Sequence, residues 1–151
     1  MEIVRGERAA QEIVGLRETV RMDALSDFFA RAMRTASEAL AARGMEPAGP
    51  PVALYTGMSD ESWDVTAGFP VPAGAAPSDE VVAAMLPGGA TVEVVHHGSY
   101  DGLPGTHGEL AAWFQENGMV VPTVVWEEYV VGPDTEADPE RWQTRIVYPA
   151  G

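Results

Sequence analysis

Apolar positions along the chain form two helical stretches separated by stretches typical of strands. From Leu25 to Leu40 the apolar residues recur every three or four positions, which predicts an amphipathic helix. Asp23 or Ser26 is suited to cap its start, and Gly44 marks its end. A second, shorter helix is predicted from His107 to Phe114, between a Gly-Leu-Pro-Gly turn and an Asn-Gly pair.

The rest of the patterned sequence is rich in β-branched residues or alternates between apolar and polar positions, which indicates strands. We predict strands over residues 12–20, 52–56, 63–69, 91–97, 124–131 and 144–148. The intervening segment, residues 72–89, is rich in Ala, Pro and Gly and is interpreted as a linker, with a helical turn over 79–85. The chain therefore reads as one domain, 1–151, in which residues 12–71 and 90–149 each form a β-α-β-β half.

An internal repeat supports the two halves, because three motifs recur in the same order. They are Asp-x-Leu at 23 and 101, Tyr55 and Tyr129, and Trp63-x5-Phe69-Pro against Trp142-x5-Tyr148-Pro, with offsets of 74 to 79 residues. The predicted fold class is α+β, with pseudo-twofold symmetry, antiparallel sheets and helices on one face. We expect the opposite face, near the pseudo-twofold axis, to form a central ligand cleft.

The most informative segment is an apolar strand that carries two adjacent carboxylates, Glu127 and Glu128. In a strand Glu127 and Tyr129 share one face, and Tyr55 occupies the place equivalent to Tyr129 in the first half. One interpretation is an edge strand that uses charge against aggregation. The other, which we favour for Glu127, is a carboxylate at the bottom of an aromatic cleft.

Aromatic residues gather in equivalent places of the two halves, where they serve either the core or a binding site. Tyr and Trp bind flat apolar or cationic ligands by stacking and cation–π contact. The predicted ligand-binding residues are Glu127, Tyr129, Tyr55, Trp63, Phe69, Tyr100, Trp126 and Tyr148. Aromatic rings around one carboxylate suit an amphipathic organic cation.

Composition and charge narrow the function classes. The 151 residues contain no cysteine and 9 basic residues, all arginine, against 23 acidic ones, for a net charge of −14. This balance disfavours nucleic-acid phosphates and anionic membranes as partners. No apolar run suggests a signal peptide or a membrane span, so we expect a cytoplasmic protein. His96 and His97 are adjacent and point to opposite faces, so we expect no metal site, and no cofactor motif is present.

Several short motifs in a fixed order resemble the GyrI-like family, the bacterial transcription-activator effector-binding domains of the SOUL/heme-binding superfamily. They are Pro50-Pro51-x4-Tyr55, Asp64-Val65 with Gly68-Phe69-Pro70-Val71, Leu86-Pro87-Gly88-Gly89, His97-Gly98-x-Tyr100-x2-Leu103, Trp126-Glu127-x-Tyr129-x3-Pro133 and Thr144-x3-Tyr148-Pro149. The resemblance covers about Glu12 to Pro149. It implies two β-α-β-β modules around a small-molecule cleft, in which Glu127 and Tyr129 take the places of a cation-accepting glutamate and its companion tyrosine.

Three functions remain open at this point. The leading hypothesis is a stand-alone binding module of the multidrug type for hydrophobic, often cationic aromatic compounds. The resemblance also includes hydrolases that open strained cyclopropane rings, which would make Glu127 and Tyr129 catalytic. A third option is a protein-interaction module acting on a target such as DNA gyrase. Regulators of the family carry a helix-turn-helix domain, which we do not expect here, and no histidine pair favours heme ligation.

Overall fold

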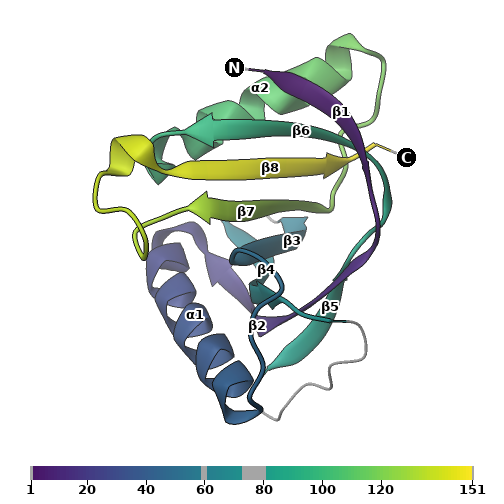
Figure 1. Ribbon diagram of the computed structural model, residues 1–151. Coiled ribbons are helices and arrows are strands. Elements are labelled where there is room, and N and C mark those ends of the chain that lie inside the picture. Colours follow the sequence, from purple (N-terminus) through teal and green to yellow (C-terminus); the bar gives the residue numbers. More distant parts are fainter. Residues whose placement is uncertain (1, 59–60, 73–80, 151) are drawn as a thin grey trace.

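Eight antiparallel strands form one curled sheet, and two helices pack against it in a computed structural model that describes residues 2–58, 61–72 and 81–150 (Figure 1). The strands are β1 Ile3–Arg8, β2 Gln11–Arg21, β3 Val52–Met58, β4 Ser62–Pro70, β5 Val82–Leu86, β6 Gly89–His97, β7 Val125–Val131 and β8 Gln143–Pro149. The helices are α1 Leu25–Ala42 and α2 Leu103–Glu116. The predicted α+β class, both helices and the six predicted strands are confirmed.

The order of strands in the sheet reveals the pseudo-twofold axis. The order is β1-β6-β8-β7-β3-β4-β2-β5. Exchanging β1–β4 for β5–β8 in turn gives the same order read from the other end. The axis therefore passes between β3 and β7, the only neighbours that join the two halves at the centre of this sheet. The helices obey the same relation, because the short 3-10 turns and the helices that follow them begin 78 residues apart, at Met22 and Tyr100 and at Leu25 and Leu103.

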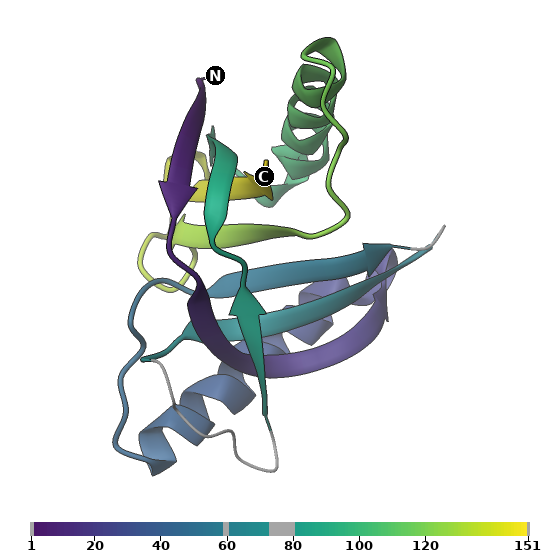
Figure 2. The same ribbon diagram turned by 90° about the vertical axis from the view of Figure 1, so that its right-hand side faces the viewer.

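Two edge strands, β1 and β5, were not predicted from the sequence. β1 precedes β2 in the chain but pairs with β6, and β5 precedes β6 but pairs with β2. Each half thus lends one strand to the other, and Figure 2 shows both connections running from one half to the other. The predicted helical turn at 79–85 is wrong where the structure describes it, because β5 pairs with β2 there, while residues 79 and 80 lie outside the described ranges.

The start of each helix also differs from the sequence-based expectation. Neither Asp23 nor Ser26 caps α1, since the N-cap residue is Ala24 and it makes no side-chain cap. A 3-10 turn leads into the helix instead. α2 begins four residues before the predicted His107, because Pro104 fits the first turn of a helix, where no backbone N–H is needed. Gly44 ends α1 as predicted, in the left-handed conformation at φ +66.

The two faces of the sheet are buried in different ways. Both helices pack on one face, where Phe28 and Ala32 of α1 and Leu110 and Phe114 of α2 belong to the same core cluster. The other face carries a cluster built from strands alone. It consists of Ile13, Val52, Leu54, Leu86, Trp126 and Val147, which come from β2, β3, β5, β7 and β8. The curl of the sheet therefore closes the face that has no helices onto itself. Within the described ranges no helix is both long and apolar enough to span a bilayer.

The connection from β5 to β6 crosses closely over the connection from β1 to β2 at Gly88. A Cβ atom on Gly88 would lie 2.7 Å from the backbone nitrogen of Ala10, which is closer than real contacts allow. Gly88→Ala is expected to lower the free energy of unfolding by about 1–3 kcal/mol because backbone must shift. Urea denaturation measures this. Gly108→Ala is the matched control, because a Cβ there meets nothing within 4 Å and the helix gains up to about 1 kcal/mol. Equal midpoints for Gly88→Ala and wild type would show that the crossing is loose.

Candidate functional site

Glu127 lies where the pseudo-twofold axis crosses the sheet. In the register of β3 and β7, Ala53 pairs with Glu127, and the two residues are also equivalent in the repeat, 74 positions apart. The axis therefore passes through this pair. Tyr55 and Tyr129 stand two residues further along their strands, so both side chains project from the same face as Glu127. One half contributes only a methyl group at the axis, which leaves the space to the carboxylate from the other half.

The two symmetry-related tyrosines converge on one carboxylate oxygen. The hydroxyl of Tyr55 donates to Oε1 of Glu127 at 3.1 Å, and the hydroxyl of Tyr129 donates to the same atom at 2.7 Å. Glu127 is 4% exposed, so these bonds replace water around a buried acidic group. The predicted trio of Glu127, Tyr55 and Tyr129 is brought together by the structure.

A histidine from α2 binds the other carboxylate oxygen. His107 Nε2 lies 2.8 Å from Oε2 of Glu127, and its Nδ1 lies 2.8 Å from the hydroxyl of Tyr148. With a charged Glu127 and a neutral ring, Nε2–H donates to the carboxylate and Nδ1 accepts from Tyr148. Glu127, His107 and Tyr148 thus form a continuous chain of hydrogen bonds from β7 through α2 to β8.

The electrostatic effect of Glu127 extends to all four tyrosines of the chain. Burial, followed by the negative charge of Glu127, raises the pKa of Tyr55 and of Tyr129 well above 10. The same two causes raise the pKa of Tyr148 to about 12. The pKa of Tyr100 is raised by burial and by the charges of Asp134 and Glu127. The tyrosines therefore remain neutral donors around the carboxylate.

Within the described residues, no arginine lies within ion-pair distance of Glu127, whose salt-bridge partner is His107 alone. Glu128, the next residue, points to the opposite face and is bound by Arg8 and Arg145. Two adjacent glutamates thus have opposite surroundings. The charge of Glu128 is balanced by arginines, whereas that of Glu127 is surrounded by uncharged hydroxyl groups and an imidazole.

Partly exposed aromatic rings lie around Glu127 and the three residues that hydrogen-bond to it. The ring of Trp63 meets that of Tyr55 edge-on, with 5.3 Å between centroids. Tyr129 has two such neighbours, Phe29 from α1 at 6.1 Å and Tyr100 at 5.7 Å. Tyr100 in turn lies 4.8 Å from the ring of Trp142. The buried carboxylate therefore has a group of partly exposed aromatic rings around its tyrosine partners, and we call these four residues, Phe29, Trp63, Tyr100 and Trp142, the rim.

Known proteins identify the family of this chain. The model of the GyrI-like small molecule binding domain matches residues 1–150. The chain belongs to this GyrI-like family. A search of curated proteins gives no significant match.

Solved structures confirm the GyrI-like fold. The chain is similar to EcmrR in a DNA complex, with a TM-score of 0.86 and 21% identity over 98% of this chain and 56% of that one. It is also similar to the isolated C-terminal domain of EcmrR, with a TM-score of 0.81 and 19% identity over 99% of this chain and 97% of that one. The chain thus spans about half the length of EcmrR in its DNA complex.

Two further structures carry information on ligands and activity. SAV2435 bound to tetraphenylphosphonium matches with a TM-score of 0.72 and 14% identity, over 100% of this chain and 94% of that one. A hydrolase encoded by lin2189 from Listeria innocua matches with a TM-score of 0.65 and 14% identity, over 99% of this chain and 92% of that one. At these identities the comparison establishes the fold.

Not every residue predicted for the GyrI-like site lies near Glu127. Trp126 is buried in the cluster on the opposite face, because strand alternation turns it away from its neighbour. Phe69 packs beneath the second half of α1 with Leu40 and Val71. His107 and Phe29 were not among the predicted site residues. The repeat could have identified them, because they are 78 positions apart and so occupy equivalent places in α1 and α2.

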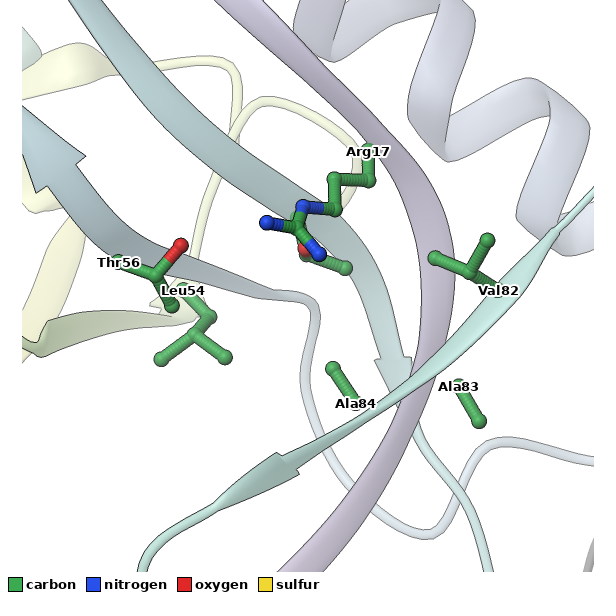
Figure 3. Close-up of a pocket in the computed structure, with 7 residues that line it drawn as sticks. Arg17, Leu54, Thr56, Val82, Ala83 and Ala84 are labelled. Atoms are coloured by element: carbon green, nitrogen blue, oxygen red, sulfur yellow. The ribbon is translucent and has the colours of Figure 1, made fainter.

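The position of the site also corrects the expectation of a cleft on the face opposite the helices. Glu127 lies on the helix-covered face, since His107 of α2 binds it. A cavity of about 180 Å³ does lie on the other face, near β5 (Figure 3). It is lined by Arg17, Leu54, Thr56, Thr66, Val82, Ala83 and Ala84. The charged side chain in this lining, Arg17, is paired with Asp64 through two hydrogen bonds of 3.1 and 2.9 Å.

The raised tyrosine pKa values predict a resistance to alkaline titration. In the folded protein, tyrosinate absorbance should stay low at pH 10 and rise toward about pH 12, whereas the unfolded chain titrates near pH 10. Because the folded state holds these protons more tightly, this contribution to stability is full below about pH 10 and is lost as the pH rises through the folded pKa values.

Glu127→Gln provides the control for this titration. Removing the charge should lower the tyrosine pKa values only in part, because burial is their larger cause. Folded wild-type protein that titrates like the unfolded chain would contradict the arrangement around Glu127.

Proposed function

We propose that this domain binds hydrophobic organic cations of the multidrug type and that Glu127 supplies the counter-charge. The observation that carries the proposal is the buried carboxylate of Glu127, whose partners are uncharged tyrosine hydroxyls and one histidine rather than an arginine. A buried charge without an opposite charge is costly unless it is solvated by donors or paired with a cation. The three donors solvate it, and a bound cation would complete the pairing.

The surroundings of Glu127 fit a cation that is also apolar. Rings of Tyr, Trp and Phe attract cations through their electron-rich faces and bury large apolar surfaces. The rim residues Phe29, Trp63, Tyr100 and Trp142 remain partly exposed, so their rings are available to a ligand. Tetraphenylphosphonium, which SAV2435 binds, has this combination of delocalised charge and aromatic surface. It is therefore the natural first probe.

A ligand would reach the carboxylate only if side chains of the rim moved aside. Glu127 is almost fully covered, and His107, whose side chain is 24% exposed, is more open than the acid it binds. Rotation of Tyr100 and Trp142, whose rings contact each other at a tilt of 38°, is the simplest opening. We infer further that the net charge of −14 keeps the domain from nucleic-acid and membrane phosphates and that it acts in the cytoplasm.

The charge role of Glu127 predicts the effect of Glu127→Gln on binding. Affinity for tetraphenylphosphonium should fall on the order of 10- to 100-fold, because a close charge pair in a protein is worth a few kcal/mol before desolvation. Affinity for triphenylphosphine oxide, a similar but neutral compound, should change little. Isothermal titration calorimetry measures both.

Glu109→Gln is the matched control, since Glu109 lies exposed on α2 and the change in net charge is the same. If Glu127→Gln and Glu109→Gln weaken tetraphenylphosphonium equally, the effect is one of net charge and the assigned site is wrong.

A hydrolase is the second candidate, and the chain of Glu127, His107 and Tyr148 favours it. A carboxylate hydrogen-bonded to an imidazole is an arrangement that enzymes use for general acid–base catalysis. In that case Glu127 and Tyr129 would be catalytic, and His107 would carry protons between Glu127 and Tyr148. The Listeria innocua hydrolase shows that this fold occurs in a protein described as an enzyme.

Turnover of a cyclopropane-bearing alkylating compound, followed by absorbance, separates the two functions. If the domain only binds, its rate should equal that of buffer alone. Turnover that exceeds buffer and is lost in both Glu127→Gln and His107→Gln would establish the hydrolase instead. Turnover that survives Glu127→Gln would assign the activity to another part of the protein.

A further inference from the structure

We propose that His107 sets the charge selectivity of the site, because its protonation neutralises Glu127 from within and competes with a cationic ligand. This inference rests on the proposed function and deepens it. A neutral His107 leaves one negative charge for a ligand to pair with. A protonated His107 forms an internal ion pair with Glu127, and the site then has no net charge to offer.

The geometry allows both protonation states without any movement of heavy atoms. The neutral ring donates to Glu127 through Nε2–H and accepts from Tyr148 at Nδ1, each at 2.8 Å. The protonated ring donates at both nitrogens, and the hydroxyl of Tyr148 can accept as readily as it donates. Both ring nitrogens are therefore hydrogen-bonded in either state. The proton can therefore enter and leave through a ring that is 24% exposed while the cluster stays intact.

The repeat shows that the fold does not need an imidazole at this place. The equivalent position of α1 holds Phe29, which packs its ring against Tyr129 at 6.1 Å and makes no polar contact there. An apolar ring at this position is therefore enough to pack α1 against the sheet. The second half differs from the first at two facing places, where Glu127 replaces Ala53 and His107 replaces Phe29. The acid and the base of the site thus lie on the same half of the repeat and bind each other.

The other titratable groups around His107 and Glu127 do not compete for this role. They are Tyr55 from β3, Tyr129 from β7, Tyr148 from β8 and Tyr100 from the turn before α2. All four have a raised pKa and stay neutral in the physiological range. α1 contributes the phenyl ring of Phe29. Histidine, in contrast, is the side chain whose charge ordinarily changes between pH 5 and 8.

Linkage then fixes the direction of the pH effect. A permanent cation binds best to the form with neutral His107, so its affinity should rise with pH, and its binding should release a proton. A similar but neutral ligand gains no charge pairing from the loss of that proton, so its affinity should depend much less on pH. Coupling of this kind between two sites is ordinarily worth a factor of about 5 to 150 in affinity.

The test measures binding of tetraphenylphosphonium and of triphenylphosphine oxide by calorimetry between about pH 5.5 and 8.5, where histidine titrates. Wild-type protein should bind the cation about tenfold more weakly at the acidic end, a typical size for such coupling. His107→Gln should remove the pH dependence, because the glutamine amide donates to Glu127 and accepts from Tyr148 but does not titrate. His97→Gln, at an exposed histidine of β6, should keep the wild-type profile.

A second measurement on wild-type protein does not depend on any variant. Binding heats of tetraphenylphosphonium in buffers of different ionisation enthalpy give the number of protons released, which should be above zero near neutral pH. A cation affinity that is independent of pH, or no proton release, overturns the role of His107 while the binding function stands. Persistence of the pH profile in His107→Gln does the same. Failure of tetraphenylphosphonium to bind at any pH overturns the proposed function and this inference with it.

Discussion

Placing one carboxylate on the pseudo-twofold axis is the constraint on which the site depends. A buried glutamate costs several kcal/mol unless donors surround it, and Glu127 receives its donors from both halves, Tyr55 from the first and Tyr129 from the second. The axis makes this possible, because residues two positions beyond it on β3 and β7 are brought to the same oxygen by symmetry. Neither half alone contains a complete set of partners. The duplicated fold thus creates the site by pairing β3 of one half with β7 of the other at the centre of the sheet.

The rest of the sheet holds that central pair in register. β1 and β5 are exchanged between the halves, so the halves are joined at both edges of the sheet as well as at its middle. On the face without helices, Arg8 of β1 binds Glu93 and Glu128, which connects an exchanged edge strand to β7. Glu128 therefore anchors the strand whose preceding residue, Glu127, faces the site. Arginines bind Glu128, whereas among the described residues the ion-pair partner of Glu127 is His107.

The sequence predicted the parts of this structure that depend on local period and on the repeat. Alternation placed Glu127 and Tyr129 on one face, and the repeat identified Tyr55 as a partner. Long-range pairing could not be predicted in the same way. β5 is short and rich in alanine, a weak strand former, and is ordered by its partner β2. The face that carries the site was also assigned wrongly, because the curl that closes the opposite face around Trp126 depends on strands far apart in the sequence.

The hydrogen bonds of Glu127 bear on the choice between binding and hydrolysis. A carboxylate offers about four lone-pair positions, and Tyr55, Tyr129 and His107 already occupy three of them. A general base must take a proton from water and needs a free lone pair aimed at that water. A counter-charge needs none, since attraction to a delocalised cation is not directional. The three hydrogen bonds of Glu127 leave about one lone pair for a base, whereas in the proposed role of counter-charge they would hold the carboxylate in place and stabilise it.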